Sequence, residues 1–258
     1  NPAAQNLLNI TTNMFGKPVE GALRKWYYYE KDSSNFTQPQ TEIELGGKPK
    51  KHVDMQVTSI MDGKGKKLGR LIILHDISKL KRVQNELHRL ANFDSLTGAV
   101  SRGHFMELAN KEIQRAIRYK RKLSLILMDM DAFKKINDTY GHASGDQALI
   151  ALKKICTHGA RKMDTFARLG GEEFALLLPE TSQKTAADLA ERLRASLELT
   201  AIQSDSAGFK VTISMGVTEF GTQEHDTLKG LLHRADKALY KAKADGRNRV
   251  IIWKPKLG

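Results

Sequence analysis

Arg168–Phe174 reads RLGGEEF, two glycines followed by two carboxylates, with apolar residues on both sides. This pattern predicts a β-hairpin that carries the glycines and acids at its tip. Upstream, Leu127–Lys134 reads LMDMDAFK, which predicts a buried strand that ends in acidic residues and a lysine. If the two strand ends lie side by side, Asp129 and Glu172 form an oxygen-rich pocket for a divalent cation, beside open glycine backbone that suits a phosphate. The arrangement indicates metal-assisted phosphoryl transfer. The alternative for an acidic pair alone is a solvated turn.

Further blocks accompany these two segments: Asp94–Gly98 (DSLTG), Phe133–His142 (FKKINDTYGH), Gly145-Asp146, Ala235–Lys243 (ADKALYKAK) and Gly246–Asn248 (GRN). Together the blocks resemble the GGDEF family of diguanylate cyclases, here in its GGEEF variant, from about Asp94 to Trp253. The resemblance implies a palm-like sheet covered by helices, of the α+β class. It also implies a nucleotidyltransferase that condenses two GTP molecules into cyclic di-GMP, with the loss of two pyrophosphates, by attack of a 3′-hydroxyl on an α-phosphate.

The resemblance implies three catalytic residues, Asp129, Glu172 and Glu173. Asp129, Glu172 and the backbone carbonyl of Met130 would hold Mg²⁺, which takes one or two carboxylates together with phosphates and water, or Mn²⁺ in its place. Glu173 is either a further metal ligand or the group that accepts the proton of the 3′-hydroxyl. Both roles stay open for Glu173.

Asn137 and Asp146 match the family's guanine-binding positions. An aspartate accepts from the N1–H of guanine but meets only an acceptor on adenine, so Asp146 favours GTP over ATP. The other expected substrate-binding residues are Phe133, Lys134, Gly170, Gly171, Lys243 and Arg247. The three basic residues are candidates for the β- and γ-phosphates, and the two glycines leave room for a phosphate to approach. The alternatives are a helix-terminal turn at Asn137 and basic residues that only offset a helix dipole.

Arg161-Lys162-Met163-Asp164 precedes the hairpin at the offset of the family's RxxD product-inhibition site. The resemblance implies that Arg161 and Asp164, completed by Arg192 of the following helix, bind cyclic di-GMP. An arginine can hold guanine O6 and N7 or a phosphate, and a carboxylate accepts from guanine N–H groups. Feedback inhibition by the product is therefore expected.

Residues 1–77 carry the pattern of a three-stranded meander. Strands are expected at Thr41–Leu45, around Val53–Val57 and at Arg70–His75, with glycine-containing turns between them. The region resembles the C-terminal two-thirds of a PAS sensor domain. It is therefore expected to be an N-terminally truncated, PAS-like antiparallel sheet domain with an unknown ligand. The aromatic cluster Trp26–Tyr29 either lines a ligand pocket or packs in the core.

Residues 78–93 carry an amphipathic helical pattern before residues 94–258, the expected catalytic domain. Apolar residues recur at spacings of three and four, at Leu80, Val83, Leu87 and Leu90. About two heptads of this kind predict a coiled-coil signalling linker that joins two chains in a homodimer, which a cyclase of this type needs. The alternative is a single amphipathic helix packed on its own domain.

The chain of 258 residues has a net charge of +13, which favours an anionic partner such as GTP or cyclic di-GMP. No nucleic-acid partner is expected, because no helix-turn-helix, zinc or RNA-binding signature is present; contact with DNA or an anionic membrane is the alternative.

The single cysteine, Cys156, fits a reducing compartment. No apolar run reaches the ~20 residues that cross a bilayer, so a cytoplasmic location is expected. The chain begins at Asn1 without a methionine, which leaves room for a membrane tether upstream.

Three other functions compete with a sensor-regulated, product-inhibited cyclase. A non-catalytic module that senses GTP or cyclic di-GMP would be expected to lack an acid of the hairpin or of the first strand, and none is missing here. A cyclase of another nucleotide is opposed by Asn137 and Asp146. A purely structural signalling dimer is opposed by the full set of phosphate and metal residues.

Overall fold

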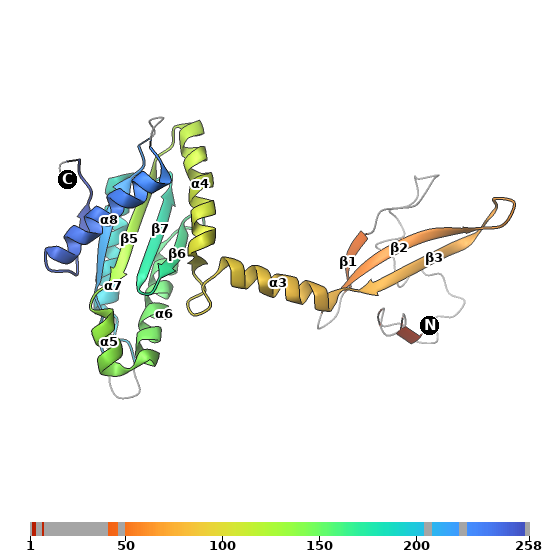
Figure 1. Cartoon of the computed structure of the whole chain (residues 1–258), viewed down its shortest axis with the longest axis horizontal. Coiled ribbons are helices and arrows are strands. Elements are labelled where there is room, and N and C mark those ends of the chain that lie inside the picture. Colours follow the sequence, from red (N-terminus) through yellow and green to blue (C-terminus); the bar gives the residue numbers. More distant parts are fainter. Residues whose placement is uncertain are drawn as a thin grey trace. The chain divides into compact units, whose positions relative to one another are not determined.

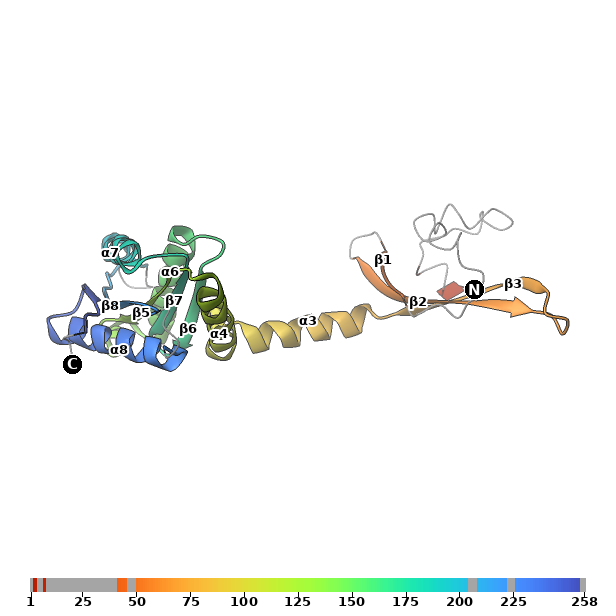
Figure 2. The same ribbon diagram turned by 90° about the horizontal axis from the view of Figure 1, so that it is seen from above.

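The computed structural model describes residues 2–3, 7, 41–45, 50–203, 208–221 and 226–255. The chain folds into two compact units, Asn1–His88 and Arg89–Gly258, which Figures 1 and 2 draw from two directions. The predicted aromatic cluster Trp26–Tyr29 lies outside the described residues. Within the described ranges, no helix combines the length and the apolar character needed to cross a bilayer.

The first unit holds a three-stranded antiparallel sheet in the order β1-β2-β3, as the meander pattern predicts. The strands are β1 Thr41–Leu45, β2 Lys51–Met61 and β3 Lys67–Asp76. Strand β3 begins earlier than predicted because Asp62 closes the turn before it. The Asp62 Oδ1 accepts the backbone N–H groups of Lys64 and Lys66, both at 2.8 Å, so pairing with β2 resumes directly after the turn.

Helix α3, Ser78–Asn92, follows β3 and contains the boundary between the two units. Asp76 supports its first turn, because the Asp76 Oδ1 accepts the Ser78 N–H at 2.9 Å. The four apolar residues of the predicted heptads are between 49% and 64% exposed: Leu80, Val83, Leu87 and Leu90. This apolar stripe is therefore open to solvent in the single chain.

The second unit is built on a six-stranded sheet in the order β4-β6-β7-β5-β8-β9. The strands are β4 Val100–Ser101, β5 Leu123–Met130, β6 Thr165–Gly170, β7 Glu173–Pro179, β8 Ile213–Glu219 and β9 Val250–Ile252. Strand β5 pairs antiparallel with both β7 and β8, whereas the pairs β4–β6 and β8–β9 are parallel. Figure 1 shows β5, β7 and β6 side by side. The mixed, helix-covered sheet agrees with the α+β class predicted from the sequence.

Helices cover both faces of this sheet. They are α4 Arg102–Tyr119, α5 Phe133–Tyr140, α6 His142–Gly159, α7 Gln183–Leu199 and α8 Leu228–Ala244. All residues of β5 are buried, and alternate residues point to opposite faces. Ile126, Met128 and Met130 pack with residues of α6 and α7, while Leu125 and Leu127 pack with residues of α4 and α8. Figure 2 shows α6 and α7 on one side of the sheet and α8 on the other.

In the second unit, the sequence pattern predicts a helix from Asp146 to Thr157 and a strand from Lys210 to Val217, and the starts of these two elements differ most from the structure. Helix α6 begins four residues earlier, because Gly141 adopts a φ of 82°, which ends α5 and lets the chain turn directly into the next helix. Strand β8 begins three residues later, at Ile213, and the residue before it, Thr212, is bound to Asp131: the Thr212 hydroxyl donates to the Asp131 carboxylate, and the Thr212 carbonyl accepts the Asp131 N–H.

Helix α8 lies directly on strand β8 at Gly216. A Cβ atom at this position would lie 2.2 Å from the Ala235 carbonyl oxygen and 2.4 Å from the Leu239 nitrogen. Both are backbone atoms, so any side chain would push the helix away from the sheet. This contact sets the depth at which α8 lies, and with it the position of Lys243 in the last turn of α8.

Candidate functional site

The carboxylates of the hairpin and of β5 meet at one edge of the sheet. The register pairs Asp129 of β5 with Glu173 of β7, and the Met130 N–H donates to the Glu172 carbonyl at 3.3 Å. Residues directly opposite each other in an antiparallel pair point to the same face, so Asp129 and Glu173 share the face that α8 covers. The two strand ends thus lie side by side, and this acidic edge comprises Asp129, Glu172 and Glu173.

Gly170 and Gly171 form the tip of the hairpin. Their φ angles are 154° and 51°, in a region that other residues rarely adopt. A Cβ atom at either position would meet nothing within 4 Å. The backbone conformation therefore requires these glycines, and their backbone stays open to an approaching ligand.

Lys243 of α8 reaches the acidic edge, where its Nζ pairs with Asp129 Oδ2 at 2.7 Å. Asp129 is only 7% exposed. Burial raises the pKa of Asp129, Lys243 lowers it, and the negative charges of Glu172 and Glu173 raise it further, with a net shift upward. The edge therefore carries an excess of negative charge that one lysine does not balance, which favours a bound cation.

The donors at the acidic edge fit a hard divalent cation with an open coordination shell. Among the described residues, no three His, Cys, Asp or Glu side chains converge into a closed cage. The available donors are the Asp129 and Glu172 carboxylates and the Met130 carbonyl. Mg²⁺ and Mn²⁺ accept such a small set of oxygens when phosphates and water complete the shell.

A second group of predicted residues lies at the junction of α5 and α6. Asn137 packs on Gly145, where a Cβ atom would lie 1.9 Å from Asn137 Oδ1 and 3.2 Å from the Phe133 ring. The Asn137 Oδ1 is buried and accepts no hydrogen bond from the described residues. Asp146 follows Gly145 and is exposed. The junction thus presents an amide and a carboxylate together, with one buried acceptor unpaired.

Two further predicted basic residues are exposed on elements that adjoin the acidic edge. Lys134 lies in the first turn of α5, which begins shortly after β5 ends. Arg247 lies in the loop after α8, and the next residue, Asn248, donates its backbone N–H to Asp131 at the end of β5. The structure therefore brings both segments to the same strand end.

The RxxD turn lies at the other end of β6 from the hairpin, about 20 Å away for a strand of six residues. The Arg161 N–H donates to Asp164 Oδ2 at 2.7 Å, while Asp164 Oδ1 is buried without a partner among the described residues. Burial raises the pKa of Asp164, and Arg161 opposes that rise. Arg192 lies on α7, where the next residue, Leu193, would be 2.7 Å from a Cβ at Gly159 of α6. The helix that carries Arg192 thus packs on the helix that leads into the turn.

Arg168 makes a link that the sequence did not predict. Its Nη1 donates to both carboxylate oxygens of Asp94 at 3.1 and 3.2 Å, and its Nε donates to the Gly171 carbonyl at 2.9 Å. Burial alone would raise the pKa of Asp94, but hydrogen bonds from Thr97 and Arg168 hold it below its ordinary value. The segment that follows α3 is therefore tied to the tip of the hairpin.

A family model described as "Diguanylate cyclase, GGDEF domain" matches residues 91–249 of this chain. The chain is 41% identical over 181 residues to the diguanylate cyclase DgcM of Escherichia coli K12, a match that covers 70% of this chain and 43% of that protein. It is 38% identical over 191 residues to diguanylate cyclase A of Treponema denticola, with coverage of 72% and 51%. The chain spans about half the length of these curated relatives.

Among solved structures, the chain is similar to the coiled coil and GGDEF domain of DgcB from Caulobacter crescentus, which was crystallised in complex with c-di-GMP. The TM-score is 0.64 and the sequence identity is 28%, over 68% of this chain and 93% of that chain.

Proposed function

The chain belongs to the GGDEF family of diguanylate cyclases, and we propose that it condenses two GTP molecules into cyclic di-GMP with the release of two pyrophosphates. One observation carries the proposal: β5 and β7 bring Asp129 and Glu173 opposite each other beside the open glycines of the hairpin, with Lys243 against them. In a nucleotidyltransferase of this type, catalysis depends on positioning and on the neutralisation of charge more than on a covalent intermediate.

We assign the acidic edge to the cation and to the attacking hydroxyl. Asp129, Glu172 and the Met130 carbonyl would hold Mg²⁺, or Mn²⁺ in its place. When bound, the cation neutralises the triphosphate and polarises the attacked α-phosphorus. Glu173 would accept the proton of the 3′-hydroxyl or contribute a further oxygen ligand. Lys243 would exchange the Asp129 carboxylate for phosphate oxygens as the substrate arrives, so it stays paired with an anion throughout.

We assign the junction of α5 and α6 to guanine. The Asn137 Nδ2 would donate to one guanine acceptor, O6 or N3, and the N1–H and one N2–H of the base suit the Asp146 carboxylate. An unpaired buried acceptor costs about 1–3 kcal/mol, and the second N2–H of guanine, donated to Asn137 Oδ1, would relieve that cost. The triphosphate would lie against Phe133, Lys134, Gly170, Gly171, Lys243 and Arg247.

We divide the chain into a PAS-like sensor region (1–77), a helical linker (78–93) and a catalytic domain (94–258). The exposed apolar stripe of α3 supports a coiled coil between two chains, and the similar protein DgcB carries a coiled coil beside its GGDEF domain. A homodimer would bring two GTP-loaded domains face to face. A ligand of the sensor region would then regulate the reaction by changing their mutual orientation through the linker.

Incubation of the purified chain with GTP and Mg²⁺, followed by chromatography of the nucleotides, tests the activity. The native chain should form cyclic di-GMP. A Glu173→Gln variant, which keeps the size of the side chain but loses its charge, should form it about 10²- to 10⁴-fold more slowly while still binding GTP. Specific activity should rise with chain concentration, because each product molecule needs two chains. GTP binding without product, even after two chains are joined covalently at the linker, would instead indicate a binding module.

Product inhibition gives a separate prediction for the RxxD turn. We propose that cyclic di-GMP binds Arg161, Asp164 and Arg192, where the unpaired Asp164 Oδ1 would accept a guanine N–H. Arg161→Ala should raise the inhibitory concentration of product about tenfold or more, since a hydrogen bond to a charged group contributes about 1.5–3 kcal/mol. Lys162→Ala, an exposed neighbour in the same turn, is the control and should leave inhibition unchanged. Equal inhibition of the Arg161→Ala variant and the native chain would rule out this assignment.

A further inference from the structure

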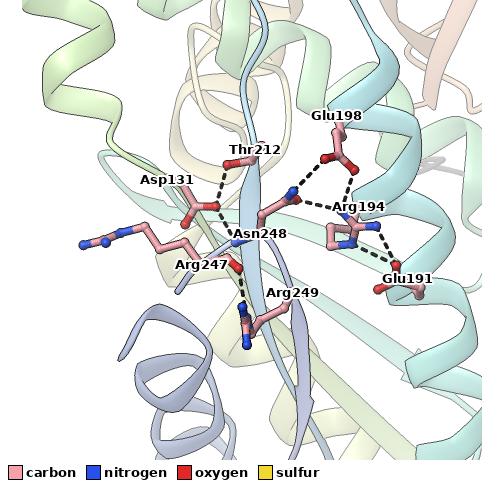
Figure 3. A network of polar contacts seen from close by, with 8 residues as sticks. All are labelled: Asp131, Glu191, Arg194, Glu198, Thr212, Arg247, Asn248 and Arg249. Carbon is pink, nitrogen blue, oxygen red and sulfur yellow. Dashed lines mark hydrogen bonds and ion pairs between the residues drawn. The ribbon is translucent and has the colours of Figure 1, made fainter. Parts of the chain in front are cut away.

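Asp131 is a buried carboxylate beside the acidic edge that has no part in the chemistry described above. It directly follows β5 and is 7% exposed. Its Oδ1 accepts the Ser214 hydroxyl at 2.6 Å, and its Oδ2 accepts both the Thr212 hydroxyl at 2.8 Å and the Asn248 N–H at 3.0 Å. Figure 3 shows Asp131 between Thr212 and the loop that carries Asn248. Its hydrogen bonds therefore join the end of β5 to that loop.

The loop after α8 has an uncommon backbone conformation. Gly246, Arg247 and Asn248 have φ angles of 113°, 62° and 47°. Glycine adopts such angles freely and asparagine tolerates them, but for arginine the left-handed region is unfavourable. A conformation of this kind persists only where surrounding contacts hold it, and it is concentrated at functional sites.

The loop is also held from the side opposite Asp131. The Asn248 Oδ1 accepts Arg194 Nη1 of α7 at 2.7 Å, and the Asn248 Nδ2 donates to Glu198 Oε1 at 2.8 Å. Arg194 is itself fixed by ion pairs with Glu191 and Glu198. In Figure 3 the Arg247 side chain extends away from this α7 cluster. Asn248 is therefore anchored on both sides, while Arg247 remains free to reach a ligand.

We propose that Asp131 is a positioning residue for the triphosphate. By accepting the Asn248 N–H, it holds the left-handed loop so that Arg247 is presented at the strand end that also carries Asp129. One strand then determines the separation between the cation-binding carboxylate and the phosphate-binding guanidinium. The inference rests on the phosphate role proposed for Arg247.

Two substitutions of Asp131 separate this role from simple packing. Asp131→Ala removes every acceptor. Asp131→Asn keeps one oxygen for the Asn248 N–H and places an amide against the Ser214 hydroxyl, which can turn to accept. Asp131→Ala should weaken binding of 3′-deoxy-GTP, which lacks the attacking hydroxyl, about tenfold or more and leave guanosine binding unchanged, whereas Asp131→Asn should stay within about threefold of the native chain.

Ser214→Ala is the matched control, because it removes one hydrogen bond of Asp131 but leaves the bond to the loop in place. It should leave the affinity for 3′-deoxy-GTP within about threefold of the native value. If Ser214→Ala and Asp131→Ala weaken binding equally, or if guanosine binding falls together with 3′-deoxy-GTP binding, Asp131 has only a structural role.

A double-variant comparison tests whether Asp131 acts through the loop. In an Arg247→Ala background, Asp131→Ala should weaken 3′-deoxy-GTP binding little further, because the group that it positions is gone. If the loss of affinity in the double variant equals the product of the losses in the two single variants, the inference is overturned. An Arg247→Ala variant that binds 3′-deoxy-GTP as tightly as the native chain would instead remove the phosphate role, and with it the premise.

Hydrogen exchange of the Asn248 amide measures, without any nucleotide, whether Asp131 stabilises the loop after α8. The Asn248 amide should exchange at least about tenfold faster in Asp131→Ala than in the native chain, because its acceptor is lost. Unchanged exchange at Asn248 would overturn the inference even if the enzyme proves to be a diguanylate cyclase. Hydrogen exchange at Asn248 and the binding of 3′-deoxy-GTP therefore distinguish a failure of the proposed function from a failure of the positioning role.

Discussion

Replacement of Asp129 with asparagine should lower the rate of cyclic di-GMP formation by about 10³-fold, because the removal of one preorganised electrostatic group commonly costs 10²- to 10³-fold and this carboxylate is also the proposed ligand of the cation. The amide keeps the shape of the side chain but removes the charge that faces Lys243 at 2.7 Å. Initial rates at saturating GTP and Mg²⁺ measure the effect. Asp138→Asn makes the same chemical change at an exposed position of α5 and should leave the rate unchanged. A loss of less than tenfold in Asp129→Asn would show that Asp129 is not the principal ligand.

Asp129→Asn, although less active, should be more stable to unfolding than the native chain. The pKa of Asp129 is raised in the folded chain, so its ionised form is disfavoured there relative to the unfolded chain. Without a divalent cation, Asp129→Asn should therefore unfold at a higher temperature than the native chain at neutral pH. The difference should shrink as the pH falls through the raised pKa, where the native carboxyl becomes protonated. Mg²⁺ should stabilise the native chain, by about 2.7 kcal/mol at 100 times its dissociation constant, and not the variant.

Gly216→Ala should destabilise the chain by about 1–3 kcal/mol and raise the KM for GTP. The added methyl group would lie 2.2 Å from one backbone atom of α8 and 2.4 Å from another, so the helix must move away from β8. The movement would displace Lys243 from the acidic edge. Chemical denaturation and steady-state kinetics measure the two effects. Gly103→Ala is the matched control, because a Cβ there meets nothing within 4 Å and alanine favours a helix, so its stability should be unchanged or higher.

The elements of the second unit were largely predictable because their signals are local. The largely apolar run from Leu123 to Met128, interrupted only by Ser124, predicted β5, and the two glycines followed by two acids predicted the β6–β7 hairpin. The start of α6 was missed because it depends on one backbone angle, the φ of 82° at Gly141, which no periodicity indicates. Strand β4 has only two residues, too few to form a pattern.

The acidic edge could be predicted because its residues lie where strands end or begin, Asp129 near the end of β5 and the two glutamates at the β6–β7 hairpin. The contacts that hold these residues in place could not be predicted. Asp94 and Arg168 are 74 positions apart, and Asp131 and Asn248 are 117 positions apart. No periodicity links residues at such separations, so only the fold brings them together. Lys243 was predicted as a phosphate ligand, but its pairing with Asp129 follows from the depth at which α8 lies on β8.

Strand β6 separates the hairpin from the RxxD turn, which has a kinetic consequence for the proposed enzyme. Two nucleotides bound about 20 Å apart do not compete for the same place, so product at the turn would act non-competitively. Extra GTP would not relieve the inhibition, which would lower the maximal rate and leave the half-saturating GTP concentration unchanged. The affinity of the RxxD turn for cyclic di-GMP, and not the supply of GTP, would then determine the product concentration at which synthesis stops.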